Sequence, residues 1–457
     1  MALLVVGITM LAVNLRASIT SLPPVFPELS AALRLSPASV ALLAAVPVLC
    51  FGVFSGPAAP LSRRFGEERV LLAALLLLVG GLVLRGAAPG SMLFPGTVLA
   101  GAGIALMNVL LPSLVKRRHP EHAGMLIGAY LLTLGGGAVI GSLIAVPVFR
   151  AAAGPGGTGW PVRITLGLWA LPAAAAAAAW LPQIRYRTRP DRPGPEAVGG
   201  SASPAGGQPL AEHAPRRGGE RESFPLGLTR RAPGRGAGAA VYRHALSWQV
   251  AAFMGLQSLY FYATLSWLPT MIRSRGVSAA AAGDMLALMN LGNAVTAMLI
   301  SVLAHRVRDQ RRLIAATVAA SAAGLSGSVF APVGGAAAWT LLLGLGQGAG
   351  LALAIFFTVA RAPDAMAAAS LSGFAQGAGY LIAAAGPLAV GFLHAATGGW
   401  RVPVLALLAV AAIEFWAGWL AARARTLPAI IAGSPGRLGS PGRPASPGSP
   451  GSIQRNL

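Results

Sequence analysis

The sequence predicts an all-α membrane protein of twelve transmembrane helices, arranged as two six-helix pseudo-symmetric bundles. Of its 457 residues, 55% are hydrophobic and only 11% are charged, unlike the average composition of a soluble protein. Apolar stretches of about 20 residues, enough to cross a bilayer core of roughly 30 Å as a helix, recur from end to end. We expect the spans near residues 2–22, 38–61, 70–88, 92–115, 124–149, 164–181, 248–272, 279–304, 313–333, 336–360, 366–395 and 402–422.

The two halves of the chain resemble each other. The segment 64–69, after the second predicted span, matches the segment 306–311 after the eighth, at an offset of 242 residues (306 − 64). At an offset of 246, Leu22-Pro23 matches Leu268-Pro269. A same-direction repeat of six spans is the plan of secondary transporters of the major facilitator type, whose site lies at the membrane midplane between the halves.

The segments between and after the halves have a different composition. A Pro-, Gly-, Ser- and Arg-rich stretch joins the halves, and the tail repeats Ser-Pro-Gly, so neither is expected to bury a core. We expect an N-terminal bundle over residues 1–182, a disordered cytoplasmic linker over 183–246, a C-terminal bundle over 247–422 and a disordered tail over 423–457. Basic residues favour the connections on the side of this linker, which predicts cytoplasmic N- and C-termini, with Arg85 in a short connection on the opposite side.

Several function classes are not expected. Cys50 is the single cysteine and the six histidines are scattered, so we expect no metal site and no cofactor. Gly135-Gly136-Gly137 lies inside a span and lacks the Lys-Ser/Thr of a phosphate loop, which argues against an enzyme. The formal net charge of +22 sits in loops between spans, where basic residues set topology, so we expect no nucleic-acid partner.

Arg16 is the strongest candidate for binding a solute. It lies a little past the middle of the first span, where a guanidinium costs on the order of 3 kcal/mol unless it faces protein, water or an anion. Arginine recognises planar oxyanions through two parallel hydrogen bonds, so we expect Arg16, with Asn14 beside it, to bind a small polar or anionic solute. The alternative is that Arg16 extends toward the membrane surface or pairs with a carbonyl.

Other polar side chains form stripes at helical spacing. At the repeat offset of 246 residues, Tyr260 is the equivalent of Asn14 and Tyr262 is the equivalent of Arg16. The expected solute-binding set outside the first span is Asn108, Tyr130, Gln257, Tyr260, Gln376 and Tyr380. Such stripes also serve simply to pack helices together, and that alternative stays open for each residue.

Two further groups are candidates for moving parts. The connections after the second and eighth spans are expected to change partners during transport, through Arg63, Arg64, Gly66, Glu67, Arg306, Arg308 and Asp309. Glu414 is the acidic residue that lies well inside a span, which makes it a candidate for proton coupling. The alternative is that Glu414 pairs with a neighbour or points to the interface.

Four groups of residues carry a resemblance to a known family. Asn14-Leu15-Arg16, the segments 47–52 and 103–117, and the seventh span with Trp267-Leu268-Pro269 resemble the cyanate and 2-nitroimidazole transporter family of the major facilitator superfamily. The resemblance covers residues 2–422 without the linker. The superfamily's loop motif Gly-x-x-x-Asp-Arg-x-Gly is altered, because Arg63 replaces the Asp. We expect Glu67 or Glu68, matched by Asp309 in the second half, to supply the acceptor instead.

The resemblance implies a permease that moves a cyanate- or nitroimidazole-like solute across the cell membrane by alternating access. Its expected partners are that solute and the lipid bilayer, and we expect a monomer. Both uptake and export fit this architecture, so a proton-coupled drug or metabolite exporter is one alternative. A membrane receptor or scaffold that has lost transport is the other.

Overall fold

The structure is a computed structural model, and it describes residues 2–118, 123–153, 159–185, 243–307, 309–363, 365–423 and 425–427. Within them it is helical throughout. The helices of the first half are α1 (Ala2–Thr20), η1 (Pro23–Val25), α2 (Phe26–Leu33), α3 (Pro37–Phe65), α4 (Glu67–Ala87), α5 (Pro89–Arg118), α6 (Ala123–Ala151), α7 (Gly159–Gly167), α8 (Ala170–Trp180) and η3 (Leu181–Arg185). Those of the second half are α10 (Ala245–Arg273), α11 (Ala279–Leu303), α12 (Arg311–Phe330), η4 (Val333–Gly335), α13 (Ala336–Ala360), α14 (Ala365–Thr397) and α15 (Arg401–Ala421).

Ten stretches of the described chain are long and apolar enough to cross a membrane, α7 and α8 together forming one of them. With α1 and α10 they make the twelve expected spans. The long helix α10 falls short of that hydropathy because it carries polar side chains, among them Gln257, Ser258 and Thr264. These side chains are buried in the protein, where an α-helix needs no apolar face toward lipid.

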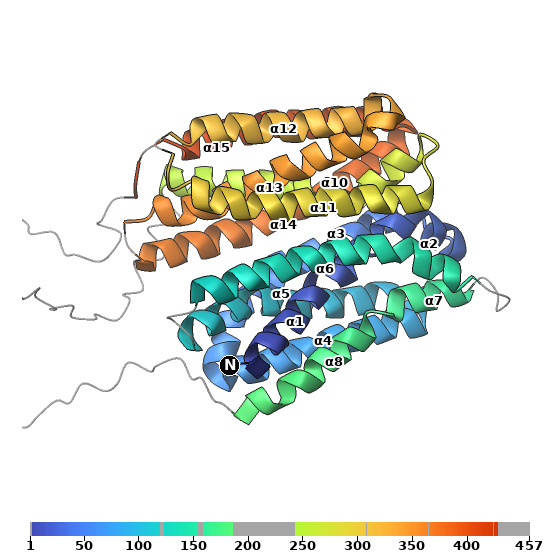
Figure 1. The fold of residues 1–457 in the computed structure, drawn as a ribbon, viewed down its shortest axis with the longest axis horizontal. Coiled ribbons are helices and arrows are strands. Elements are labelled where there is room, and N and C mark those ends of the chain that lie inside the picture. Colours follow the sequence, from blue (N-terminus) through green and yellow to red (C-terminus); the bar gives the residue numbers. More distant parts are fainter. Residues whose placement is uncertain are drawn as a thin grey trace, which may run out of the picture.

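The helices form two bundles with matching arrangements, drawn in blue to green and in yellow to red in Figure 1. In the first, α1 packs on α6 and α8, α4 on α5, and α3 on α5. In the second, α10 packs on α14 and α15, α12 on α13, and α11 on α13. The two bundles meet along α3 with α14 and along α6 with α11, so the contact between them is also matched. The prediction of two pseudo-symmetric six-helix bundles is confirmed.

The bundles are tied together at the end that carries η1, α2 and the α10–α11 connection, which we name the closed end. The Arg273 guanidinium of α10 donates to both carboxylate oxygens of Glu28 on α2, at 2.8 and 2.7 Å, and to the carbonyl of Pro24 at 3.2 Å. Nearby, the rings of Phe26 and Trp267 lie 6.3 Å apart. The opposite end, where α3 joins α4, is named the open end.

Replacing Arg273 with glutamine is expected to loosen the closed end. A half-exposed ion pair contributes about 1 kcal/mol, so its loss shifts the balance toward separated bundles about fivefold. Spin labels on Ala38→Cys and Ser274→Cys, in a Cys50→Ser background, should then report longer distances. The matched control is Arg275→Gln, because Arg275 donates to Ser328 and Ala331 of its own bundle. Equal distances in both variants would contradict the assignment.

One expectation about the connections is wrong. Arg85 lies in the last turn of α4, only 2% exposed, rather than in a solvated connection. Its Nε donates to the carbonyl of Leu166 at 3.0 Å and its Nη2 to that of Ser18 at 3.3 Å. Leu166 lies at the carboxyl end of α7, where helix carbonyls are unpaired and favour a cation, so Arg85 fastens α4 to α7 and to α1.

Candidate functional site

A cavity of about 360 Å³ lies between the bundles. It extends from Ala138 and Asn290, at mid-height, toward Gly128 and Val302 near the open end. Beyond it, Asn290 donates to Ser142 across the bundle contact at 3.2 Å. The lining is mostly apolar and consists of Arg16, Gly128, Leu131, Leu132, Leu134, Gly135, Ala138, Phe261, Asn290, Asn293, Ala294, Ala297, Met298, Ser301, Val302, Leu351, Ala352 and Ile355.

Arg16 carries the one charge in this lining. Its guanidinium carbon lies 5.4 Å from the ring centre of Phe261 and 5.8 Å from that of Tyr262, so a cation–π contact joins α1 to α10 across the bundles. Within the part of the chain that the structure describes, the guanidinium makes no hydrogen bond and no ion pair. The side chain is half-buried, so its five N–H donors face the cavity region without an acceptor.

Aromatic rings from three helices gather beside Arg16. We name Phe51, Phe261, Tyr262 and Tyr380 the aromatic cluster. The ring centre of Tyr262 lies 6.2 Å from Phe51, 5.1 Å from Phe261 and 6.5 Å from Tyr380, and Phe51 and Tyr380 are 5.6 Å apart. Edge-to-face geometry at these distances stabilises the cluster. It offers flat apolar surfaces and tyrosine hydroxyls close to a cation.

Three members of the aromatic cluster were absent from the predicted set, namely Phe51, Phe261 and Tyr262. A signal for one was present in the sequence, because Tyr262 is the repeat equivalent of Arg16. The structure brings these two equivalents together at 5.8 Å. The repeat equivalent of a candidate site residue is therefore itself a candidate for the same site.

Of the predicted solute-binding residues, Tyr130 and Tyr380 lie near Arg16. The positive charge of Arg16 is close enough to act on the phenol groups of both residues. Tyr130, on α6, also donates from its hydroxyl to Asn108 Oδ1 on α5, at 3.3 Å. This pair links Asn108 to the region of Arg16, so three of the expected residues share one neighbourhood with it.

Other predicted residues make their hydrogen bonds within their own bundles. Asn14 Nδ2 donates to the carbonyl of Met10 at 2.8 Å within α1, and Tyr260 donates to the carbonyl of Ser321 on α12 at 3.2 Å. Gln257 is buried and donates to Ser258 Oγ at 2.7 Å. Gln376 donates to Ser372 Oγ of its own helix at 2.9 Å, and it does not line the cavity.

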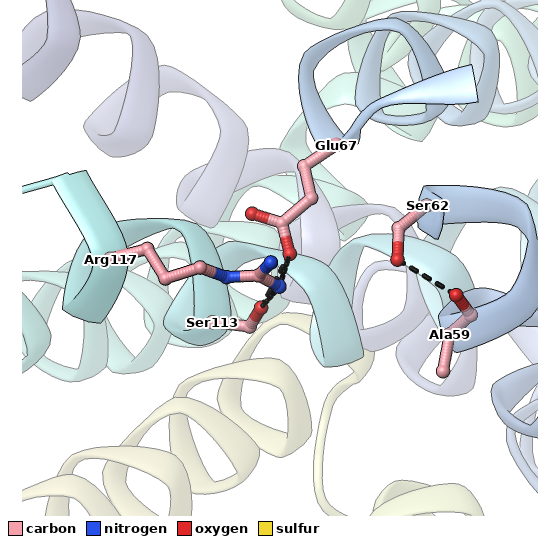
Figure 2. Close-up of polar contacts among 5 residues, drawn as sticks. All are labelled: Ala59, Ser62, Glu67, Ser113 and Arg117. Carbon is pink, nitrogen blue, oxygen red and sulfur yellow. Dashed lines mark hydrogen bonds and ion pairs between the residues drawn. The ribbon is translucent and has the colours of Figure 1, made fainter. Parts of the chain in front are cut away.

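The connection after α3 holds an ion pair between a buried acid and an exposed arginine at the open end. Arg63 and Arg64 are exposed in the last turn of α3, and Gly66 follows with φ +89°, a conformation that disfavours other residues. Glu67 begins α4 and is fully buried, where its Oε1 accepts from Arg117 and, at 2.6 Å, from Ser113 of α5 (Figure 2). In the same view Ser62 bonds the carbonyl of Ala59, one turn earlier in α3.

The equivalent connection of the second half has an uncharged counterpart. Arg361 Nη2 donates to Gln310 Oε1 at 3.3 Å and also caps α15 through the carbonyls of Ala421 and Ala422. Arg306 is exposed, Asp309 accepts from the Arg311 amide at 3.0 Å, and Arg308 lies outside the described residues. The contacts of Glu67 with Ser113 and Arg117 therefore lie within the first bundle, and in this conformation Glu67 does not join the two bundles.

The sequence matches the model of the Major Facilitator Superfamily over residues 4–384. It is 38% identical to the 2-nitroimidazole transporter of Escherichia coli (strain K12) over 402 residues, 88% of this chain and 91% of that relative. It is 34% identical to the uncharacterized transporter YycB of Bacillus subtilis (strain 168), covering 92% and 94%. It is 27% identical to the cyanate transport protein CynX of Escherichia coli (strain K12), covering 86% and 90%.

Solved structures show the same fold. A bacterial homologue of the human lysosomal transporter Spinster, inward-facing and unoccupied, has a TM-score of 0.71 at 15% identity, covering 95% of this chain and 98% of that one. A D-xylose–proton symporter has a TM-score of 0.65 at 15% identity, covering 93% and 99%. The fold, the repeat and the matched sequence agree with the resemblance stated above. The chain belongs to the major facilitator superfamily and is a multi-pass membrane transporter of small-molecule solutes, not an enzyme.

Proposed function

We propose that this transporter moves a small polar or anionic solute, cyanate- or nitroimidazole-like, across the cytoplasmic membrane by alternating access. One observation carries the proposal: the Arg16 guanidinium lies between the bundles, over two aromatic rings, with no acceptor among the described residues. A cation placed there at a cost is stabilised by an anion or by a strongly dipolar group. The names of the nitroimidazole and cyanate relatives favour the same chemistry.

The geometry favours a planar solute with one negative or dipolar end. A nitro group, a carboxylate or cyanate accepts hydrogen bonds from the fork of Arg16. The ring of Phe261, which lines the cavity, gives the rest of a flat molecule a surface to lie against. One arginine rather than two faces the cavity in the described chain, which favours a monoanion or a neutral dipole over a dianion.

Alternating access follows from the two unequal ends. The Arg273–Glu28 contact holds the closed end, while the cavity extends toward the open end. In the opposite state the closed-end contacts break and the open ends approach, with Arg63, Arg64, Arg306 and their neighbours changing partners. We further propose that both termini and the linker lie in the cytoplasm and that the working unit is a monomer.

A proton-coupled exporter of drugs or metabolites is the second candidate. The observation that favours it is the mostly apolar lining of the cavity, which accepts larger apolar molecules as well as small anions. The two candidates differ in solute and direction, not in architecture.

Thermal unfolding of the purified protein tests the solute. We expect 2-nitroimidazole, cyanate, nitrate or benzoate to raise the melting temperature, because a ligand at 100 times its Kd stabilises by about 2.7 kcal/mol. Uptake of the stabilising compound into proteoliposomes then shows transport. Lipophilic drugs are the comparison set. Stabilisation by drugs alone would favour the exporter. If no compound stabilises the protein and none is transported, a transport role for this site is contradicted.

A further inference from the structure

Glu414 is a buried acid that the central site does not use. It lies in the middle of α15 and is 4% exposed. In the part of the chain that the structure describes, its carboxyl group makes no hydrogen bond and no ion pair. An acidic group buried in a helical bundle without a partner is costly when charged, so its presence requires a reason.

Four helices of the second bundle meet at this carboxyl group. The Cβ that Gly350 of α13 lacks would lie 3.8 Å from Glu414 Oε1, 3.7 Å from Gln257 Cβ of α10 and 3.5 Å from Thr317 Cγ2 of α12. Glu414 thus faces the interior of the bundle, with an amide and a hydroxyl-bearing side chain around the same point.

No charge compensates Glu414. The titratable or charged side chains that pack against α15 from other described elements are Tyr260, Tyr262 and Arg273 of α10, Arg311 and Arg312 of α12, Tyr380 and His394 of α14, and Arg361 directly after α13. None of these side chains forms an ion pair or a hydrogen bond with Glu414. A proton removes the uncompensated charge directly, because it converts the carboxylate into a neutral acid.

We propose that Glu414 is the proton-binding site that couples a proton gradient to transport. In one state of the bundles a proton from water forms an O–H bond on the carboxylate. In the other state that bond breaks and the proton returns to water on the opposite side, while the solute is chemically unchanged. The site lies inside the second bundle, separate from the Arg16 cavity.

Helix α10 connects this site to the solute. Gln257 and Tyr260 lie on the side of α10 that faces the bundle interior and Glu414. Phe261 and Tyr262, one and two residues later than Tyr260, contact Arg16. A change of charge at Glu414 acts on α10, the helix that carries Phe261 and Tyr262 of the aromatic cluster. Protonation of Glu414 and binding of the solute therefore both influence the position of α10.

The transport test rests on the proposed function and uses 2-nitroimidazole in proteoliposomes. Glu414→Gln keeps the shape of the neutral acid and cannot release a proton. We expect it to lose at least about 10-fold of the accumulation driven by an imposed pH gradient, while solute exchange at equal pH stays within about twofold of the parent. The control is Asp284→Asn, an exposed acid on α11, which should behave like the parent. Unchanged gradient-driven accumulation in Glu414→Gln would overturn the proposal.

A second test needs no solute. The infrared carbonyl band of a protonated carboxylic acid, which shifts in D₂O, should be present in the parent and missing in Glu414→Gln. It should weaken as the pH is raised across the range in which the protein stays folded, because the carboxyl group then releases its proton. A Glu414 that keeps one protonation state throughout would overturn the proposal. If the parent moves no nitroimidazole, the proposed solute is wrong, and this spectrum alone decides the role of Glu414.

Discussion

Replacing Arg16 with glutamine is expected to weaken solute binding by roughly 10- to 100-fold. Hydrogen bonds to a charged group contribute about 1.5–3 kcal/mol, and each 1.4 kcal/mol is tenfold in Kd. Glutamine keeps a polar side chain of similar reach but loses the charge and the fork, along with the contacts to Phe261 and Tyr262. Isothermal titration with the solute that stabilises the parent measures the change.

Two further variants make the Arg16 result specific. Arg16→Lys keeps the charge without the planar fork, so we expect an affinity between those of the parent and the glutamine variant. Arg150→Gln removes an exposed arginine from the last turn of α6 and should leave the Kd unchanged. A parent-like Kd in Arg16→Gln would remove Arg16 from the binding site.

Replacing Gly348 with alanine is expected to destabilise the second bundle by about 3 kcal/mol or more. The new Cβ would lie 2.0 Å from the backbone oxygen of Asn293 and 2.9 Å from its Cα. These are backbone atoms of α11, which cannot relieve the overlap by a change of rotamer, so α11 and α13 must separate. Thermal melting and the yield of monodisperse protein in detergent measure the loss.

The matched control for Gly348 is Gly136→Ala on α6. Its Cβ would meet no atom within 4 Å. Alanine is favoured over glycine in a helix by about 1 kcal/mol, so this variant should melt at the same temperature or higher. We expect the melting temperature to fall for Gly348→Ala and to stay the same or rise for Gly136→Ala. An equal fall in both variants would show that helix packing at Gly348 is not the cause.

The sequence predicted the spans closely because lipid contact imposes a clear apolar pattern. The tenth span was expected at 336–360 and is observed as α13, Ala336–Ala360. The sixth was expected as a single helix over 164–181, but two helices, α7 and α8, form it. The short helix α2, which carries Glu28, was not predicted, because eight residues give too brief a pattern.

The orientation of side chains on α10 was harder to predict. Nearly all of this helix is buried, so both its faces carry polar and aromatic residues and no lipid-facing side marks the direction. Gln257 and Tyr260 were expected at the cavity from their spacing, yet Tyr260 donates to a carbonyl of α12 and Gln257 to Ser258 of its own helix. Arg85 was misplaced for a similar reason, because a buried arginine and a loop arginine look alike in sequence.

Arg16 and Tyr262 occupy equivalent positions in the two repeats, and they stand face to face. Two points related by a twofold axis are this near only when the axis passes between them. A solute bound at Arg16 would therefore contact both repeats at once, so its affinity would depend on how the two bundles are placed relative to each other. Net flow would then be driven by the concentration difference of the solute, together with that of any coupled ion.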